Sequence, residues 1–79
     1  MKIKPNWRNA PLWAKWWCVN QDGEAYWFDE KPVYFPSGGY KNQGYWEVPD
    51  RKDECCEFDK HFDVKLSHVE CIQTLRKSP

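Results

Sequence analysis

Residues 16–28 read "WWCVNQDGEAYWF", two aromatic and β-branched runs on either side of a turn sequence. The runs 16–19 and 25–29 flank an Asp-Gly pair, which is a strong signal of a β-hairpin. Two registers are compatible with this pattern. A two-residue turn places Trp17 opposite Phe28, whereas a type I turn with a glycine bulge places Trp17 opposite Trp27 and Trp16 opposite Phe28.

Tryptophan is expected on both faces of this hairpin. Trp16 and Trp17 are adjacent, and successive residues of a strand point to opposite sides. Both faces therefore carry an indole ring in either register. One face can pack on the core of a small domain, while the other needs a cover from the C-terminal segment, a second copy of the chain or a partner.

The 79 residues predict one small domain of the α+β class, mainly β. We expect a small antiparallel sheet of three to four strands, built on the hairpin, extended by a strand at 45–48, and followed by a short C-terminal helix. The expected segments are an N-terminal arm at 1–12, with a helical turn near 10–15 capped by Asn9, an aromatic β-meander at 13–49, a polar connection at 50–60 and a C-terminal segment at 61–79. Within the last segment, competing periods favour a strand near 62–67 and a helix near 69–76.

Charge and hydropathy exclude several classes of function. Lys plus Arg and Asp plus Glu both number 12, so the net charge is zero and no basic stripe for nucleic acid is visible. No run reaches the roughly 18 apolar residues of a membrane span, and the first residues have no signal-peptide core. We therefore expect a cytoplasmic protein with reduced cysteines. A net charge of zero also favours self-association, so a homodimer is an alternative.

The cysteines and histidines allow a zinc hypothesis. Cys56, His61, His68 and Cys71 follow the spacing C-x4-H-x6-H-x2-C, with the ligand types that zinc prefers. The spacing lacks the tight pair of cysteines that usually opens a small zinc site, so we expect no metal or other cofactor and keep the zinc module as an alternative. His68 and Cys71 also suggest a base and a nucleophile. Because they lie on an apolar stripe, we expect packing there and no enzymatic activity.

Part of the chain resembles a WW domain. The residues that carry this resemblance are Trp16, Gly23, the aromatic triplet 26–28 and the Trp46-Glu47-Val48-Pro49 sequence. The connection between Phe28 and Trp46 is far longer than in that family, and the Asn-His expected after the triplet is missing. The resemblance implies a three-stranded arrangement and does not extend to the binding of proline-rich peptides.

The first 32 residues are similar to a diffuse group of small, tryptophan-rich proteins of tailed bacteriophages. The shared features are Trp7, the "APLWA" sequence at 10–14, the Gln21-Asp22-Gly23 turn, the aromatic strand 26–28, Lys31-Pro32 and, more weakly, the ending 74–79. The resemblance implies an accessory phage protein in the cytoplasm of the infected bacterial host. Such proteins commonly bind a host protein, to redirect it or to inhibit a host defence.

Exposed aromatic rings are the expected means of binding. Protein contact surfaces are enriched in Trp, Tyr and Arg, and a few buried anchors supply most of the affinity. The predicted function is therefore non-catalytic binding of a host protein, with a self-associating structural phage protein and a zinc module as alternatives. The candidate anchors are Trp7, Trp13, Trp16, Trp27 and Tyr40.

Overall fold

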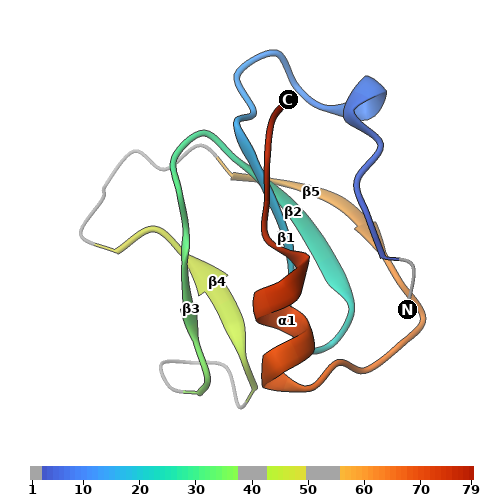
Figure 1. Ribbon diagram of the computed structural model, residues 1–79, viewed down its shortest axis with the longest axis vertical. Helices are drawn as coiled ribbons and strands as arrows, with labels where there is room; N and C mark the ends of the chain where they lie inside the picture. The colour runs from blue at the N-terminus through green and yellow to red at the C-terminus, as the bar shows by residue number, and fades with distance from the viewer. Residues whose placement is uncertain (1–2, 38–42, 50–55) are drawn as a thin grey trace.

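The computed structural model describes residues 3–37, 43–49 and 56–79, which form short strands and one short helix (Figure 1). The elements are η1 (Trp7–Asn9), β1 (Trp16–Val19), β2 (Glu24–Phe28), β3 (Val33–Phe35), β4 (Tyr45–Glu47), β5 (Cys56–His61), α1 (His68–Thr74) and β6 (Arg76–Lys77). The mainly β, α+β class with a central hairpin and a short C-terminal helix is confirmed.

The hairpin of β1 and β2 adopts the register of the glycine bulge. Trp17 lies opposite Trp27, and Trp16 lies opposite Phe28. The backbone of Gly23 has a φ of +92°, a conformation that L side chains rarely adopt. A Cβ atom at this position would also lie 2.2 Å from the carbonyl oxygen of Phe62, so the turn and the packing both require glycine.

The strands that flank the hairpin differ from those expected. The order of the larger sheet is β5-β2-β1-β6, with antiparallel pairing throughout. The prediction that 45–48 extends the hairpin is wrong, because β4 pairs with β3 in a separate two-stranded sheet. Residues 56–60, predicted as part of a polar connection, belong to the edge strand β5.

The segment 62–67 is irregular and not a strand. Its backbone bonds lead to the hairpin turn, because the amide of Phe62 donates to the carbonyl of Gly23 and the amide of Leu66 donates to that of Gln21. Phe62 and Leu66 pack on the core, whereas Val64 is exposed. The alternation of apolar and polar residues at 62–66, which predicted a strand, thus belongs to a loop that Phe62 and Leu66 attach to the core.

Helices begin where polar side chains satisfy their first amide groups. Ser67 accepts a hydrogen bond from the amide of Glu70, and Glu70 accepts one from the amide of Ser67, so the two form a capping box for α1. In the N-terminal arm, Asn6 caps η1, so the helical turn lies earlier than the expected one. Asn9, the expected cap, is the last residue of η1.

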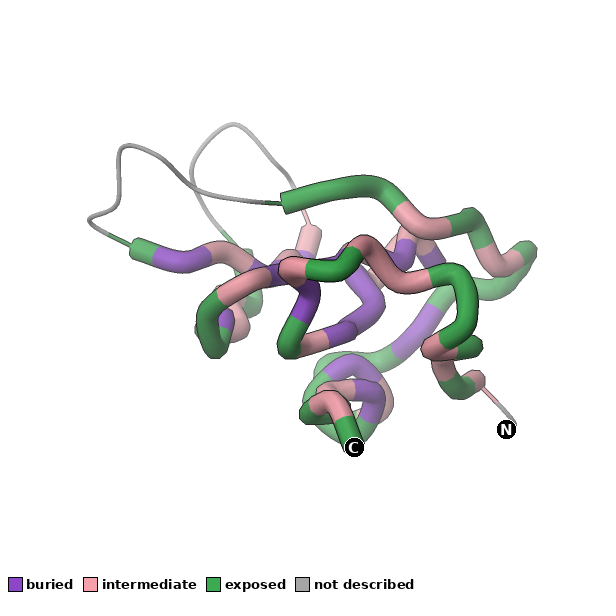
Figure 2. Tube along the Cα trace, turned by 90° about the horizontal axis from the view of Figure 1, so that it is seen from above, coloured by how far each residue is buried: buried purple, intermediate pink, exposed green. Residues whose placement is uncertain are grey.

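Two groups of buried residues lie on opposite faces of the hairpin. Cluster A contains Ala14, Trp17, Val19, Ala25, Trp27, Leu66 and Cys71. Cluster B contains Cys18, Phe28, Trp46 and Val48. In Figure 2 the buried parts of the chain run through its middle, while much of β5 is exposed. The expected two-sided hairpin is present, and the chain itself supplies much of the cover on each face.

Candidate functional site

The predicted aromatic anchors occupy different environments. Trp27 is only 1% exposed, so it is a core residue and its prediction as an exposed anchor is wrong. Trp7 packs against it with ring centroids 5.2 Å apart, and both Trp7 and Trp13 are half-buried against cluster A. Tyr40 lies outside the described residues. Among the candidates on the sheet, Trp16 is the one that keeps partial exposure.

Two lysine side chains lie close to the ring of Trp16. It projects on the side of cluster B, opposite Lys77 in the pairing of β1 with β6. The ammonium groups of Lys31 and Lys77 lie 5.6 and 5.9 Å from the centroid of its ring. At these distances a cation is attracted to the negative face of an indole. We call Trp16, Lys31 and Lys77 the Trp16 site.

Leu12 is the most exposed large apolar residue in the described chain, with a relative exposure of 107%. It sits in a turn in which the amide of Ala14 donates to the carbonyl of Pro11. The next residue, Trp13, packs on cluster A and so holds this turn against the domain. Leu12 was not among the predicted anchors, although an apolar residue in a proline turn is unusual. The turn lies near the C-terminus, at the end of the sheet where β1 begins (Figure 1).

His68 and Cys71, the suggested base and nucleophile, both lie against the hydroxyl of Tyr34. Nδ1 of His68 lies 2.6 Å from the hydroxyl of Tyr34, and this hydroxyl also contacts the Cys71 thiol. Burial raises the pKa of the Cys71 thiol and the pKa of Tyr34. A protonated thiol is a poor nucleophile. A Cβ at Gly44 would overlap the Tyr34 hydroxyl, so these groups are also tightly packed.

The proposed zinc ligands are not brought together. His61 is the last residue of β5, and its Nε2 lies 3.0 Å from the carbonyl oxygen of Asp22. His68 and Cys71 lie on α1. Cys56 begins β5 and is exposed. Within residues 3–37, 43–49 and 56–79, no three His, Cys, Asp or Glu side chains are grouped so that they could hold a metal ion.

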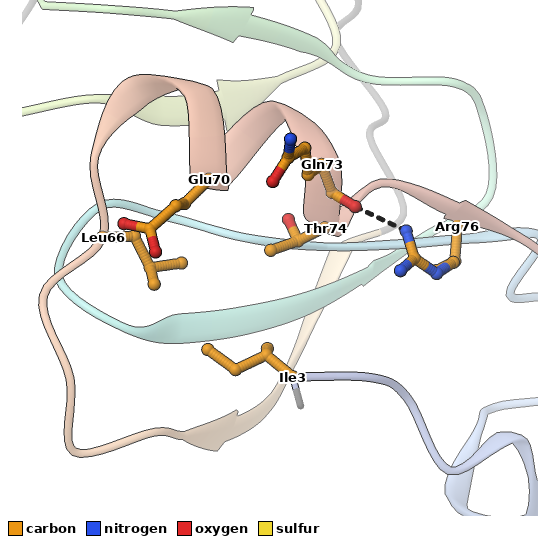
Figure 3. A pocket seen from close by; sticks show the side chains of 6 residues that line it. All are labelled: Ile3, Leu66, Glu70, Gln73, Thr74 and Arg76. Carbon is orange, nitrogen blue, oxygen red and sulfur yellow. Dashed lines mark hydrogen bonds between the residues drawn. The ribbon is translucent and has the colours of Figure 1, made fainter. Parts of the chain in front are cut away.

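A shallow pocket of about 170 Å³ separates α1 from the N-terminal arm (Figure 3). Its lining residues are Ile3, Leu66, Glu70, Gln73, Thr74 and Arg76. The polar groups of this wall make bonds within the fold: Glu70 caps α1, and Arg76 donates to the carbonyls of Gln73 and Leu75. Hydrogen bonds from Ser67 lower the pKa of the Glu70 carboxyl. The polar groups of Glu70 and Arg76 in this pocket therefore stabilise α1 and the chain that follows it.

Thr74 shows how the same wall supports the sheet. Its hydroxyl donates to the carbonyl of Cys71 and accepts from the amide of Val19. The carbonyl of Val19 accepts from the indole Nε1 of Trp46. The strand β6 pairs only with Trp16 and Trp17 and does not reach Val19. The side chains of Thr74 and Trp46 therefore make the hydrogen bonds to the amide and carbonyl of Val19 that a neighbouring strand would otherwise make.

No helix in the described part of the chain combines the length and the apolar character that crossing a bilayer requires. No family model, curated protein or solved structure matches this chain. The candidate site therefore rests on its geometry, and the best candidate is the half-buried ring of Trp16 with its two lysines.

Proposed function

We propose that this chain is a non-catalytic accessory protein of a tailed phage, and that it binds a host protein in the bacterial cytoplasm through the Trp16 site. The phage setting is supported by the sequence resemblance over the first 32 residues. The binding role is supported by one observation: Trp16 stays partly exposed and has two ammonium groups near its ring.

Trp16 suits the role of an anchor because its position is already fixed. Its backbone pairs with strands on both sides, opposite Phe28 on β2 and Lys77 on β6. A residue on a paired strand loses little backbone entropy on binding, which raises the affinity that its contact area provides. Leu12 adds an exposed aliphatic side chain in the turn that precedes β1.

The charges beside the ring indicate the chemistry of the partner. A partner with an apolar recess for Trp16 and carboxylates at its rim would bury the ring and pair with Lys31 and Lys77. Complementary charges of this kind accelerate association and select between partners. The proposal therefore specifies an acidic protein surface as the target.

Affinity capture from a bacterial lysate, followed by binding measurements with the captured protein, tests this function. The intact chain is compared with a Leu12→Ser, Trp16→Ala variant. Loss of a central anchor should weaken binding at least about tenfold. The double variant Lys31→Glu, Lys77→Glu should also weaken binding. The loss should be larger at low salt than at high salt, because salt screens the attraction between the lysines and the carboxylates of the partner.

A Val69→Ser variant is a matched control, because Val69 is 64% exposed on α1 and belongs to neither feature. It should bind as the unmodified chain does. If the Leu12→Ser, Trp16→Ala variant captures the same proteins at the same yield, the Trp16 site is not the binding surface.

A further inference from the structure

Within residues 3–37, 43–49 and 56–79, the strand β5 forms one edge of the larger sheet. It pairs with β2 on one side, and no described strand pairs with it on the other. Five of its six residues, all except Asp59, are exposed. The outward amide and carbonyl groups of an edge strand are a ready template for another strand.

A bulge at Asp59 changes which side chains of β5 share a face. Ala25 lies opposite Lys60 and Tyr26 lies opposite Phe58, so Asp59 is the extra residue between them. Its carboxylate accepts a hydrogen bond of 2.9 Å from the indole of Trp17, which places it on the side of cluster A.

Glu57 and Lys60 therefore lie on the same face. Glu57 is opposite Trp27 and Lys60 is opposite Ala25, and both of these β2 residues belong to cluster A. In a strand without a bulge, residues three apart point to opposite faces. The ammonium group of Lys60 lies 4.9 Å from the ring of Phe62, which also packs on cluster A.

We propose that β5 pairs antiparallel with β5 of a second copy, with Glu57 of each copy opposite Lys60 of the other. The twofold symmetry of such a dimer forms this oppositely charged pair twice. Opposite charges directly across two strands stabilise the pairing, and like charges destabilise it. A shift of one residue would place Glu57 opposite Asp59 or His61 and lose both pairs, so the charges select one register.

The backbone directions are compatible with this register. The amide of Phe62 donates to the carbonyl of Gly23. Because every second residue of an antiparallel strand bonds to the same neighbour, the amide of Lys60 also points toward β2. The bulge adds one residue, so the amide of Glu57 points toward β2 as well. In the new ladder both residues occupy positions without backbone bonds, where opposing side chains approach most closely.

Two further observations favour a second copy as the occupant. Phe58 is 50% exposed and lies beside the proposed twofold axis, so pairing removes part of its ring from water. The chain has a formal net charge of zero, so two copies approach without net repulsion. An unrelated straight strand does not match the bulged edge, whereas a second copy carries the same bulge at the symmetric position.

Dimerisation through β5 is independent of the Trp16 site. Trp16 and Lys77 belong to β1 and β6, and β6 is at the opposite edge of the sheet. A dimer would carry two such sites and bind a target with two epitopes more tightly than one copy does.

Light scattering coupled to gel filtration, over increasing concentrations of the full chain, tests the dimer. Glu57→Lys and Lys60→Glu should each weaken association about tenfold, because each replaces two attractive pairs with two repulsive ones. The double variant Glu57→Lys, Lys60→Glu should restore the affinity. Lys65→Glu, an exposed charge change outside β5, is the control and should associate normally.

A monomer at every concentration would overturn the proposal, and so would a double variant as weak as the single ones. Hydrogen exchange locates the contact: the outward amides of Phe58 and His61 should gain protection with concentration. Protection confined to other strands would contradict pairing through β5. Trp16→Ala should leave the dimer unchanged, so a failure of the host-binding proposal is recognised separately.

Discussion

The two faces of the β1–β2 hairpin both carry tryptophan, but different parts of the chain cover them. On the face of Trp17 and Trp27, the cover comes from segments on both sides of the hairpin in sequence: the N-terminal arm with Trp7, and the 62–71 region with Leu66. On the face of Trp16 and Phe28, the buried cover comes from the strand β4 and the residue after it, Val48.

The extent of cover differs as well. Trp17 and Trp27 are no more than 1% exposed, whereas Trp16 is half-buried. The strand β4 has only three residues, and it buries the central Phe28 but leaves Trp16 and Phe58 partly exposed toward the two edges of the sheet. The strand β4 thus covers only the centre of this face and leaves Trp16 and Phe58 partly exposed. The proposed host contact uses Trp16, and the proposed dimer contact uses the edge that carries Phe58.

Replacing one tryptophan on each face should give the largest contrast. Trp27→Ala removes a buried indole that contacts Trp7, and should lower the free energy of unfolding by about 3–5 kcal/mol. This is a large part of the roughly 5–15 kcal/mol that stabilises a small domain. Trp16→Ala removes a half-buried ring and should cost about 1–2 kcal/mol. Urea unfolding followed by circular dichroism measures both values.

The matched variants Trp27→Phe and Trp16→Phe keep an aromatic ring and should cost less than the alanine changes. Equal losses for Trp27→Ala and Trp16→Ala would show that the two faces contribute alike to stability, contrary to the difference in burial.

The indole N–H groups allow a finer comparison. Trp46 donates to the buried carbonyl of Val19, and Trp17 donates to the partly buried carboxylate of Asp59, both at 2.9 Å. Trp46→Phe leaves that carbonyl without its donor and should cost about 1–3 kcal/mol for the unsatisfied group. Trp17→Phe should lose less for its hydrogen bond, about 0.5–1.5 kcal/mol, because water can reach Asp59.

A double-mutant cycle separates the hydrogen bond between Trp17 and Asp59 from the packing that is lost when phenylalanine replaces the larger indole. Asp59→Ala should destabilise the unmodified chain, but should add little in the Trp17→Phe background. If the two substitutions are fully additive in urea unfolding, the contact between Trp17 and Asp59 contributes no coupling energy.

The sequence predicts the parts of the fold that depend on local signals. The Asp22-Gly23 turn identified the hairpin, and the two turn types compatible with it limited the register to two choices, of which the structure has one. A helix was expected at 69–76 and is found at His68–Thr74. The edge strand β5 was not predicted, because a strand exposed on both faces has no alternation of apolar and polar residues.

The candidate site was predictable only in part. Periodicity showed that Trp16 and Trp27 lie on strands, but not which of them would be covered. Cover depends on segments outside the hairpin: the side of Trp27 receives the arm with Trp7 and the loop with Leu66. Leu12 was missed because its exposure depends on the orientation of a turn, which residue types alone do not determine.

The smallest expected effect concerns pH on the side of cluster B. Tyr26 is packed against this cluster and donates a hydrogen bond to Glu24. Partial burial, with a smaller contribution from the charge of Glu24, raises the pKa of Tyr26 to about 12 from 10. The unfolded chain therefore loses this proton at a lower pH than the folded chain. The stabilising contribution is fully present below pH 10 and is lost as the pH rises through 12.

Tyr26→Phe should therefore reduce the loss of stability between pH 10 and 12, measured by urea unfolding at several pH values. It should not abolish the loss, since burial also raises the pKa of Tyr34. Glu24→Gln removes the neighbouring charge and should lower the pKa of Tyr26, which absorbance of the phenolate reports directly. If Tyr26→Phe and the unmodified chain lose stability with the same slope, Tyr26 titrates alike in the folded and unfolded states. The partial cover on this face would then leave its tyrosine as hydrated as in the unfolded chain, and the contrast between the two faces would be sharper than the buried residues indicate.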